Sequence, residues 1–181
     1  GTGHYAQYRD ATTNSSFNDI CIYRKKEVFK FFHKKFNELC TYSLNTKSKV
    51  NSAFLSADFK EALKTFEGGT VYADPPYCFV HYSRFYHALE TLVLYDYPEI
   101  QKKNNVIVKG RYREDRHQSP FCIKTKVEDA FLDMFKGVES TKSQLALSYS
   151  NTGMISLETM MELASSVWDS SKIEILTTDH Q

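Results

Sequence analysis

A short apolar segment, Thr70–Ala73, lies between two residue pairs that strongly restrict the backbone. Gly68-Gly69 precedes it and breaks the helical pattern of residues 59–66. Pro75-Pro76 follows it after a single acid, Asp74. Because proline has no backbone N–H, it cannot continue a hydrogen-bonded strand. The sequence therefore predicts a short strand that stops at the proline pair and carries Asp74 at its C-terminal end.

The segments around this strand alternate between strand and helix patterns. Residues 52–57 are short and apolar, residues 59–66 can form a helix, and residues 70–73 return to a strand. In such a βαβ unit the strands are parallel and joined by a right-handed crossover, so both end at the same edge of the sheet. Ligands of α/β proteins bind at that edge. We therefore expect Asp58 and Asp74 to face one cleft.

Hydrophobic periodicity predicts further elements on either side of this unit. Apolar residues recur at steps of three and four between residues 23 and 42, which indicates an amphipathic helix with lysines on its other side. The other predicted elements are helices at 86–94, 127–141 and 157–165, strands at 145–149 and 172–176, a turn at Asn151-Thr152-Gly153, and loops at 1–19 and 96–120. The long charged loop at 96–120 suggests a functional segment.

The sequence Asp74-Pro75-Pro76-Tyr77 offers hydrogen-bond acceptors and almost no donors. An ionised Asp74 only accepts, and the two prolines contribute only carbonyl groups. An exocyclic NH2 group can donate one hydrogen to the carboxylate and one to a proline carbonyl, while the Tyr77 ring gives a face for stacking a base. The alternative is structural: the prolines end the strand and Tyr77 fills a gap.

The composition is that of one ordinary globular domain of 181 residues. The chain has no run of about 18 apolar residues and no charged-then-apolar leader, so we expect a cytoplasmic protein that makes no contact with a membrane. Its 4 cysteines are scattered, without zinc-ligand spacing, and we expect them to be reduced, structural and free of metal.

A formal net charge of +1 argues against a protein that coats nucleic acid through bulk electrostatics. Basic residues nevertheless form two local clusters. One cluster lies within residues 24–35, and the other contains Lys102, Lys103, Lys109, Arg111, Arg113, Arg116 and His117. For each cluster two interpretations stay open, a solvated face or a contact with DNA phosphates.

Asp74-Pro75-Pro76-Tyr77 resembles motif IV of the N6-adenine DNA methyltransferases, in the Dam-like class D12. Ser56-Ala57-Asp58-Phe59 resembles motif III, and residues 147–153 resemble motif V of the same family. The resemblance implies that Asp74, Pro75, Pro76 and Tyr77 are catalytic and that Asp58, Phe59 and Asp74 bind the cofactor, S-adenosylmethionine. It further implies that the target base or DNA is contacted by Tyr82, Ser150, Asn151, Arg111, Arg113 and Arg116, and that residues 82–87 and 119–122 contribute pocket or DNA contacts.

The resemblance also implies an α/β fold, part of a Rossmann-like methyltransferase with a mostly parallel sheet flanked by helices. The expected substrate is adenine flipped out of double-stranded DNA, within a restriction–modification system that has a cognate endonuclease. The family's Phe-x-Gly-x-Gly cofactor loop does not occur in the sequence and would precede residue 1. We therefore expect residues 46–181 to be the catalytic core, residues 1–45 to be part of a target-recognition segment, and the isolated chain to be inactive.

Two other functions remain compatible with the sequence. The chain can be a catalytically silent fragment of the same fold that binds DNA or protein. It can also belong to a methyltransferase that acts on RNA or on protein amides. A motif with asparagine at position 74 would resemble the motifs of those enzymes equally well. The acid at this position therefore favours an enzyme that acts on adenine in DNA.

Overall fold

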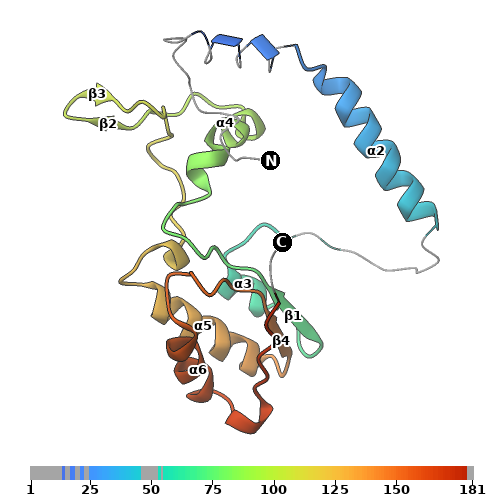
Figure 1. Ribbon diagram of the computed structural model, residues 1–181, viewed down its shortest axis with the longest axis vertical. Coiled ribbons are helices and arrows are strands. Elements are labelled where there is room, and N and C mark those ends of the chain that lie inside the picture. Colours follow the sequence, from blue (N-terminus) through green and yellow to red (C-terminus); the bar gives the residue numbers. More distant parts are fainter. Residues whose placement is uncertain are drawn as a thin grey trace. The chain divides into compact units, whose positions relative to one another are not determined.

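The computed structural model describes residues 14, 17–18, 21–22, 25–45, 53 and 55–178. Contacts divide the chain into two compact units, with the boundary between Phe54 and Leu55. The first unit contains the helix α2 (Val28–Asn45; Figure 1). None of the residues of α2 is buried. The helix predicted over 23–42 is thus confirmed, with its start moved to Val28. The loop predicted over residues 1–19 lies mostly outside the described residues, and Asn14, Phe17 and Asn18 are helical.

The second unit is organised around a parallel pair of strands, β1 (Thr70–Ala73) and β4 (Gln144–Leu147). Gly68 and Gly69 form the turn into β1 with φ angles of 73° and 88°, a region that favours glycine. This turn fixes the register, because the Gly68 N–H donates to the Thr141 carbonyl and the Gln144 N–H donates to the Gly69 carbonyl. Both strands therefore end at the same edge of the sheet.

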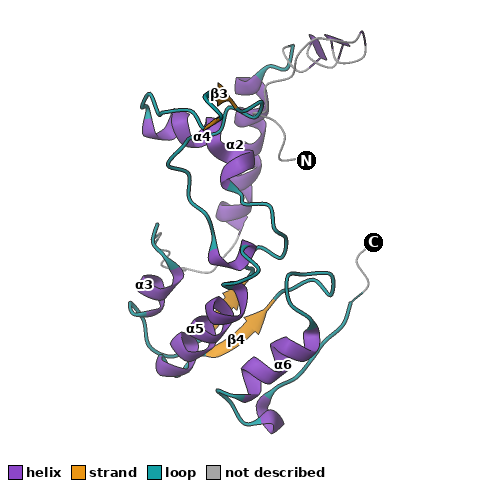
Figure 2. Cartoon of the chain, turned by 90° about the vertical axis from the view of Figure 1, so that its left-hand side faces the viewer, coloured by secondary structure: helices purple, strands orange, loops and turns teal. Residues whose placement is uncertain are grey.

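Helix α5 (Val127–Ser140) forms the centre of the hydrophobic core. Its buried side chains recur every three or four residues, as the sequence predicts for an amphipathic helix. Helix α5 contacts α3 (Phe59–Leu63), α6 (Leu157–Ser165), the short 3-10 helix η1 (Pro120–Cys122) and β4, and Figure 2 shows it beside β4. Helices thus flank a small parallel sheet, which is the expected fold class.

Local capping explains where two of these helices begin. The Asp58 carboxylate accepts a hydrogen bond from the Lys60 N–H at the start of α3, and the Ser156 hydroxyl accepts one from the Thr159 N–H at the start of α6. Such caps satisfy backbone donors that have no partner within the helix. The predicted bounds of α6 are confirmed, whereas α3 ends at Leu63, earlier than the predicted residue 66.

Between β1 and α5 the chain forms α4 (Ser83–Leu94) and an antiparallel hairpin of β2 (Lys102–Lys103) and β3 (Val106–Ile107). The helix predicted over 86–94 is confirmed and starts earlier, at Ser83. The long loop predicted over 96–120 thus contains a short hairpin that was not predicted from the sequence. Asn104 and Asn105 connect the two strands with φ angles of 52° and 61°, which asparagine tolerates better than most residues.

Two predicted strands are wrong among the described residues. Residues 53 and 55–57 are not part of a strand, so the predicted βαβ unit is not formed there and β1 pairs with β4 instead. At the other end of the chain, residues 170–172 form the 3-10 helix η2 and residues 173–178 continue without strand pairing. Both segments are short apolar runs, and such runs form strands only where a neighbouring strand offers a partner.

Candidate active site

The C-terminal ends of β1 and β4 bring two of the predicted motifs to one edge of the sheet. Ala73 pairs with Leu147 in the parallel register, and the Ser148 N–H donates to the Ala73 carbonyl at 2.9 Å. Asp74 therefore follows β1 where Ser148 follows β4. The Asp74 side chain is exposed, Pro75 is buried and Tyr77 is 46% exposed. An acceptor and an aromatic ring are thus available to a ligand at this edge.

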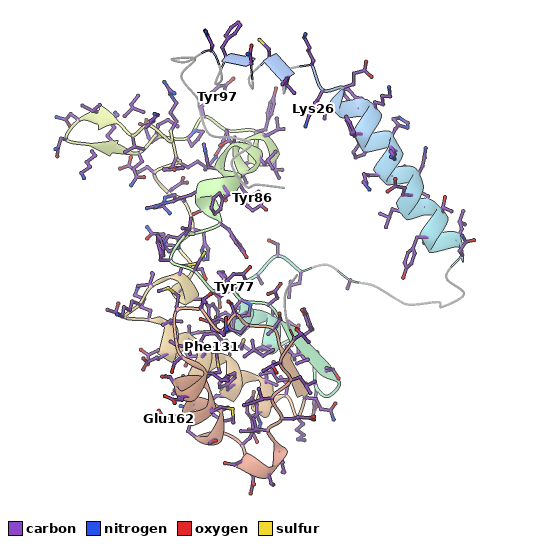
Figure 3. The ribbon with its side chains drawn as sticks, in the orientation of Figure 1. Lys26, Tyr77, Tyr86, Tyr97, Phe131 and Glu162 are labelled. Atoms are coloured by element: carbon purple, nitrogen blue, oxygen red, sulfur yellow. The ribbon has the colours of Figure 1, made fainter. Side chains whose placement is uncertain are left out.

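Tyr82 lies near these residues at the start of α4. Burial raises the pKa of its phenol, and Tyr77 and Asp74 raise it further through their charges. The Tyr82 ring meets the Tyr86 ring edge-on, with centroids 6.3 Å apart. Figure 3 shows Tyr77 in the segment after β1 and Tyr86 on α4. Half-exposed aromatic rings of this kind suit the stacking of an unpaired base.

Ser150 and Asn151 form the turn that follows β4. The Ser150 hydroxyl accepts a hydrogen bond from the Thr152 N–H, and the Gly153 N–H donates to the Ser150 carbonyl. The predicted turn is confirmed, and Asn151 is exposed at its tip. The Tyr149 hydroxyl accepts a hydrogen bond from the Met154 N–H at 2.8 Å, which ties the turn to the following segment.

Asp58 and Phe59 line a separate cavity of about 520 Å³. Its lining residues are Ser56, Ala57, Asp58, Phe59, His117, Ser119, Pro120 and Phe121. The volume falls within the range of about 300–1,000 Å³ that is typical of small-molecule sites. The Phe59 and Phe121 rings are 5.3 Å apart, and one Asp58 oxygen already caps α3. Residues 74–77 are not among the residues that line this cavity.

Arg113 has a different environment from the one expected of a DNA contact. Only 4% of its side chain is exposed, and its guanidinium donates to both oxygens of Asp96, at 2.7 and 2.6 Å, and to the Thr91 hydroxyl at 3.0 Å. This guanidinium, mainly through its hydrogen bond, holds the pKa of Asp96 below its usual range. The structure thus assigns Arg113 to anchoring the segment after α4, which corrects the DNA-contact prediction for this residue.

Replacing Arg113 with methionine is expected to loosen residues 96–114. Three amides of this segment depend on its folded path: Gln101 donates to the Tyr112 carbonyl, Val108 to the Gln101 carbonyl and Glu114 to the Glu99 carbonyl. Without the guanidinium, Asp96 loses its partner and Thr91 keeps only its bond to the His87 carbonyl, so these amides should exchange with solvent faster.

Hydrogen exchange measured by NMR tests this prediction. The amides of α5 serve as the internal reference, and Lys109→Met, which removes an exposed cation of the same segment, serves as the matched control. Unchanged exchange at Gln101, Val108 and Glu114 in the Arg113 variant would contradict the anchoring role.

Other basic side chains of the segment remain candidates for the predicted contacts with DNA. Arg111 is exposed, with a φ angle of 47°. Arg116 is half-buried, and its guanidinium lies 6.0 Å from the centroid of the Tyr112 ring. Arg84 lies 5.8 Å from the same centroid. The sequence did not show that Arg84, Tyr112 and Arg116 meet, because more than twenty residues separate α4 from the second arginine.

The cysteines that the structure describes are not arranged as metal ligands. All 4 cysteines are free thiols, and the Cys78 and Cys122 sulfurs lie 3.9 and 3.8 Å from the Val80 carbonyl oxygen. No group of His, Cys, Asp or Glu among the described residues is arranged to hold a metal ion. The described helices also include none that is long and apolar enough to cross a membrane.

Comparison with known proteins identifies relatives for most of the chain. The family model of the D12 class N6 adenine-specific DNA methyltransferases matches residues 5–163. The chain is 30% identical over 134 residues to modification methylase LlaI of Lactococcus lactis subsp. lactis, covering 74% of this chain and 20% of that protein. It is 30% identical over 118 residues to type II methyltransferase M.FokI of Planomicrobium okeanokoites, covering 65% of this chain and 17% of that protein.

A third relative is type II methyltransferase M.NlaIII of Neisseria lactamica, 28% identical over 108 residues, which are 59% of this chain and 29% of that protein. The matched region thus spans less than a third of each of these curated relatives. No solved structure matches the chain significantly.

Proposed function

Because this chain belongs to the D12 class of N6 adenine-specific DNA methyltransferases, we propose that its full-length protein methylates the amino nitrogen of adenine in double-stranded DNA, with S-adenosylmethionine as the methyl donor. The observation that carries this proposal is the edge of the β1–β4 sheet. There Asp74 is exposed directly after β1, beside the aromatic rings of Tyr77 and Tyr82.

The chemistry follows from the acceptors at this edge. The lone pair of the adenine amino nitrogen is delocalised into the ring, so the nitrogen is a poor nucleophile. Asp74 and the Pro75 carbonyl accept the two amino hydrogens and draw the group toward tetrahedral geometry, which directs the lone pair at the methyl carbon. Methyl transfer would form the new N–C bond, leave the electrons of the broken S–C bond on the departing sulfur and require the nitrogen to release one proton to solvent. Rate enhancement then comes from alignment and electrostatics.

The adenine must leave the duplex to reach these acceptors. Flipping it out costs about a few kcal/mol, and stacking on an aromatic ring returns about 1–3 kcal/mol. Tyr77 and Tyr82 supply such rings, each about half exposed. Ser150 and Asn151 border the same edge from β4 and are our candidates for contacts with the target base.

We propose the cavity at Asp58 as the site for the adenine end of S-adenosylmethionine. Its volume, its carboxylate and the paired rings of Phe59 and Phe121 match an adenine that donates from its amino group and stacks. One Asp58 oxygen is engaged by the Lys60 N–H, and the second is left for this role. When bound, the cofactor supplies the activated methyl group.

We further propose that residues 1–45 contribute to target recognition, that residues 46–181 form the catalytic core, and that the exposed Arg111 contacts DNA. The names of the relatives, a modification methylase and type II methyltransferases, support a role in a restriction–modification system with a cognate endonuclease as partner. A DNA substrate is consistent with action in the cytoplasm.

The test is a methylation assay with the full-length protein and radiolabelled S-adenosylmethionine. We expect label in N6-methyladenine of duplex DNA, and we expect Asp58→Ala to raise the cofactor KM while DNA affinity stays constant. Labelling of RNA or of a protein amide in place of DNA would favour the other methyltransferase class. Absence of both cofactor binding and labelling would favour a silent interaction module.

A further inference from the structure

Four basic side chains gather at the N-terminal end of α4, directly after the proposed catalytic residues: His81, Arg84, Arg116 and His117. The Ser83 hydroxyl donates to the His117 carbonyl at 2.6 Å, and an Arg116 Nη donates to the Ser83 hydroxyl at 3.3 Å. These bonds hold the start of α4 against residues 116–117. Arg84 and Arg116 both lie on the Tyr112 ring.

The Tyr112 ring is a fixed support for the two guanidinium groups. His87, itself buried, meets this ring edge-on with centroids 5.2 Å apart. On another side the ring lies so close to Gly110 that a Cβ there would overlap it. Tyr112 also directly precedes Arg113, whose guanidinium binds Asp96. The positions of Arg84 and Arg116 are therefore set by packing.

The structure describes no carboxylate that pairs with this cluster of positive charge. Among the described residues, Asp96 and Asp115 pair with Arg113, and neither Arg84 nor Arg116 forms an ion pair. Burial and then the neighbouring Arg84 lower the pKa of Arg116. Burial, followed by Arg116, Arg84 and His117, lowers the pKa of His81. Like charges held together without a counter-ion are unfavourable unless an anion joins them.

Buried polar atoms without a hydrogen-bond partner point to the same conclusion. His81 is 8% exposed and its Nδ1 has no hydrogen-bond partner, and the Nε of Arg84 is likewise buried and unpartnered. Buried polar atoms without partners are rare in native proteins and call for an explanation. The first turn of α4 contains no acidic residue, so the positive end of its helix dipole adds to the field.

We propose that His81, Arg84 and Arg116 form a binding site for one phosphate group, the backbone phosphate next to the adenine at Asp74–Tyr77. The identity of this phosphate rests on the proposed function. Guanidinium groups suit the site because they bind phosphate oxygens in pairs. Holding that phosphate would fix the backbone of the flipped nucleotide beside Tyr82.

The first test measures DNA affinity of the full-length protein against salt concentration. The slope of log K against log[salt] changes by about 0.9 for each phosphate neutralised on duplex DNA. We expect the double variant R84Q/R116Q to lower the slope by about 0.9, and either single variant to lower it by less, because both arginines hold one phosphate. Lys136→Gln removes an exposed cation of α5 and should leave the slope unchanged.

An unchanged slope in R84Q/R116Q would overturn the proposal, and a loss of about 1.8 would show two separate phosphates instead of one site. Arg84→Lys keeps the charge and is the control for a loss of binding that is caused by misfolding of the glutamine variants. It should keep most of the slope but lose affinity, since an ammonium group cannot replace a planar guanidinium.

The second test uses inorganic phosphate and the imidazole NMR signals of His81. Bound phosphate should raise the His81 pKa in the wild type and have a smaller effect in R84Q/R116Q. If the protein neither binds nor methylates DNA yet phosphate shifts His81, the proposed function fails and the anion site stands. If methylation is normal while phosphate does not shift the His81 pKa and R84Q/R116Q does not change the salt slope, only the proposal of the anion site is overturned.

Discussion

Asp74→Asn in the full-length protein is expected to lower kcat for adenine methylation by a factor of about 10²–10³ or more, the usual loss when a preorganised transition-state contact is removed. The amide keeps the size of the side chain but removes the charge and replaces one acceptor with a donor. Asp74 is exposed after β1, so the fold should tolerate the change. Asp74→Ala should act in the same direction.

The measurement separates kcat from DNA affinity. Because the carboxylate acts on the amino group at the transition state, duplex binding by either variant should stay close to that of the wild type. Glu162→Gln removes an exposed carboxylate of α6 and serves as the matched control (Figure 3). If DNA affinity fell as far as kcat, Asp74 would be supporting the structure of the edge and not the chemistry.

Phe131→Ala is expected to destabilise the core by about 3–5 kcal/mol, the usual cost of emptying a buried aromatic site. The Phe131 side chain is 0% exposed, and its ring contacts those of Phe121, Phe135 and Tyr149 at centroid distances of 5.0, 6.0 and 5.2 Å. Phe121 in turn packs on Phe59, so the cavity at Asp58 should loosen as well. Phe131→Leu leaves a smaller void and should cost less.

Denaturant unfolding followed by tryptophan fluorescence measures this effect. The chain has a single tryptophan, Trp168, whose ring lies 5.3 Å from that of Phe135, so the signal reports on the α5–α6 core. Leu92→Ala on α4, where the side chain is 69% exposed, is the control and should change the midpoint little. A Phe131→Ala midpoint equal to the control's would show that the core is not centred on this ring.

The sequence predicted the elements whose own residues show which side is buried or where the element ends. Helices α4, α5 and α6 were predicted because their apolar residues recur at helical spacing, and β1 because glycines and prolines bound it. The strands at 52–57 and 172–176 were predicted wrongly as far as these residues are described, since an apolar run does not reveal whether a partner strand is present. The β2–β3 hairpin was missed, although Asn104-Asn105 is a signal for its turn.

The residues of the candidate site also include some that the sequence could predict and others that it could not. Asp74–Tyr77 could be recognised from the local chemistry of acceptors, because all of its residues are adjacent in sequence. The pairing of Arg113 with Asp96, and the meeting of Arg84 with Arg116 on Tyr112, depend on how the segment after α4 folds back. Charge along the sequence gave no way to tell the anchoring arginine from those that remain available to a ligand.

The parallel pairing of β1 with β4 has a consequence for folding. These strands pair across the whole of α4, the β2–β3 hairpin and α5, so closing the sheet requires a long loop and is entropically costly. Contacts of high sequence separation form slowly compared with local helices. During synthesis β1 cannot pair with β4 until β4 has been translated. The edge that presents Asp74 should therefore be among the last parts of this unit to become ordered.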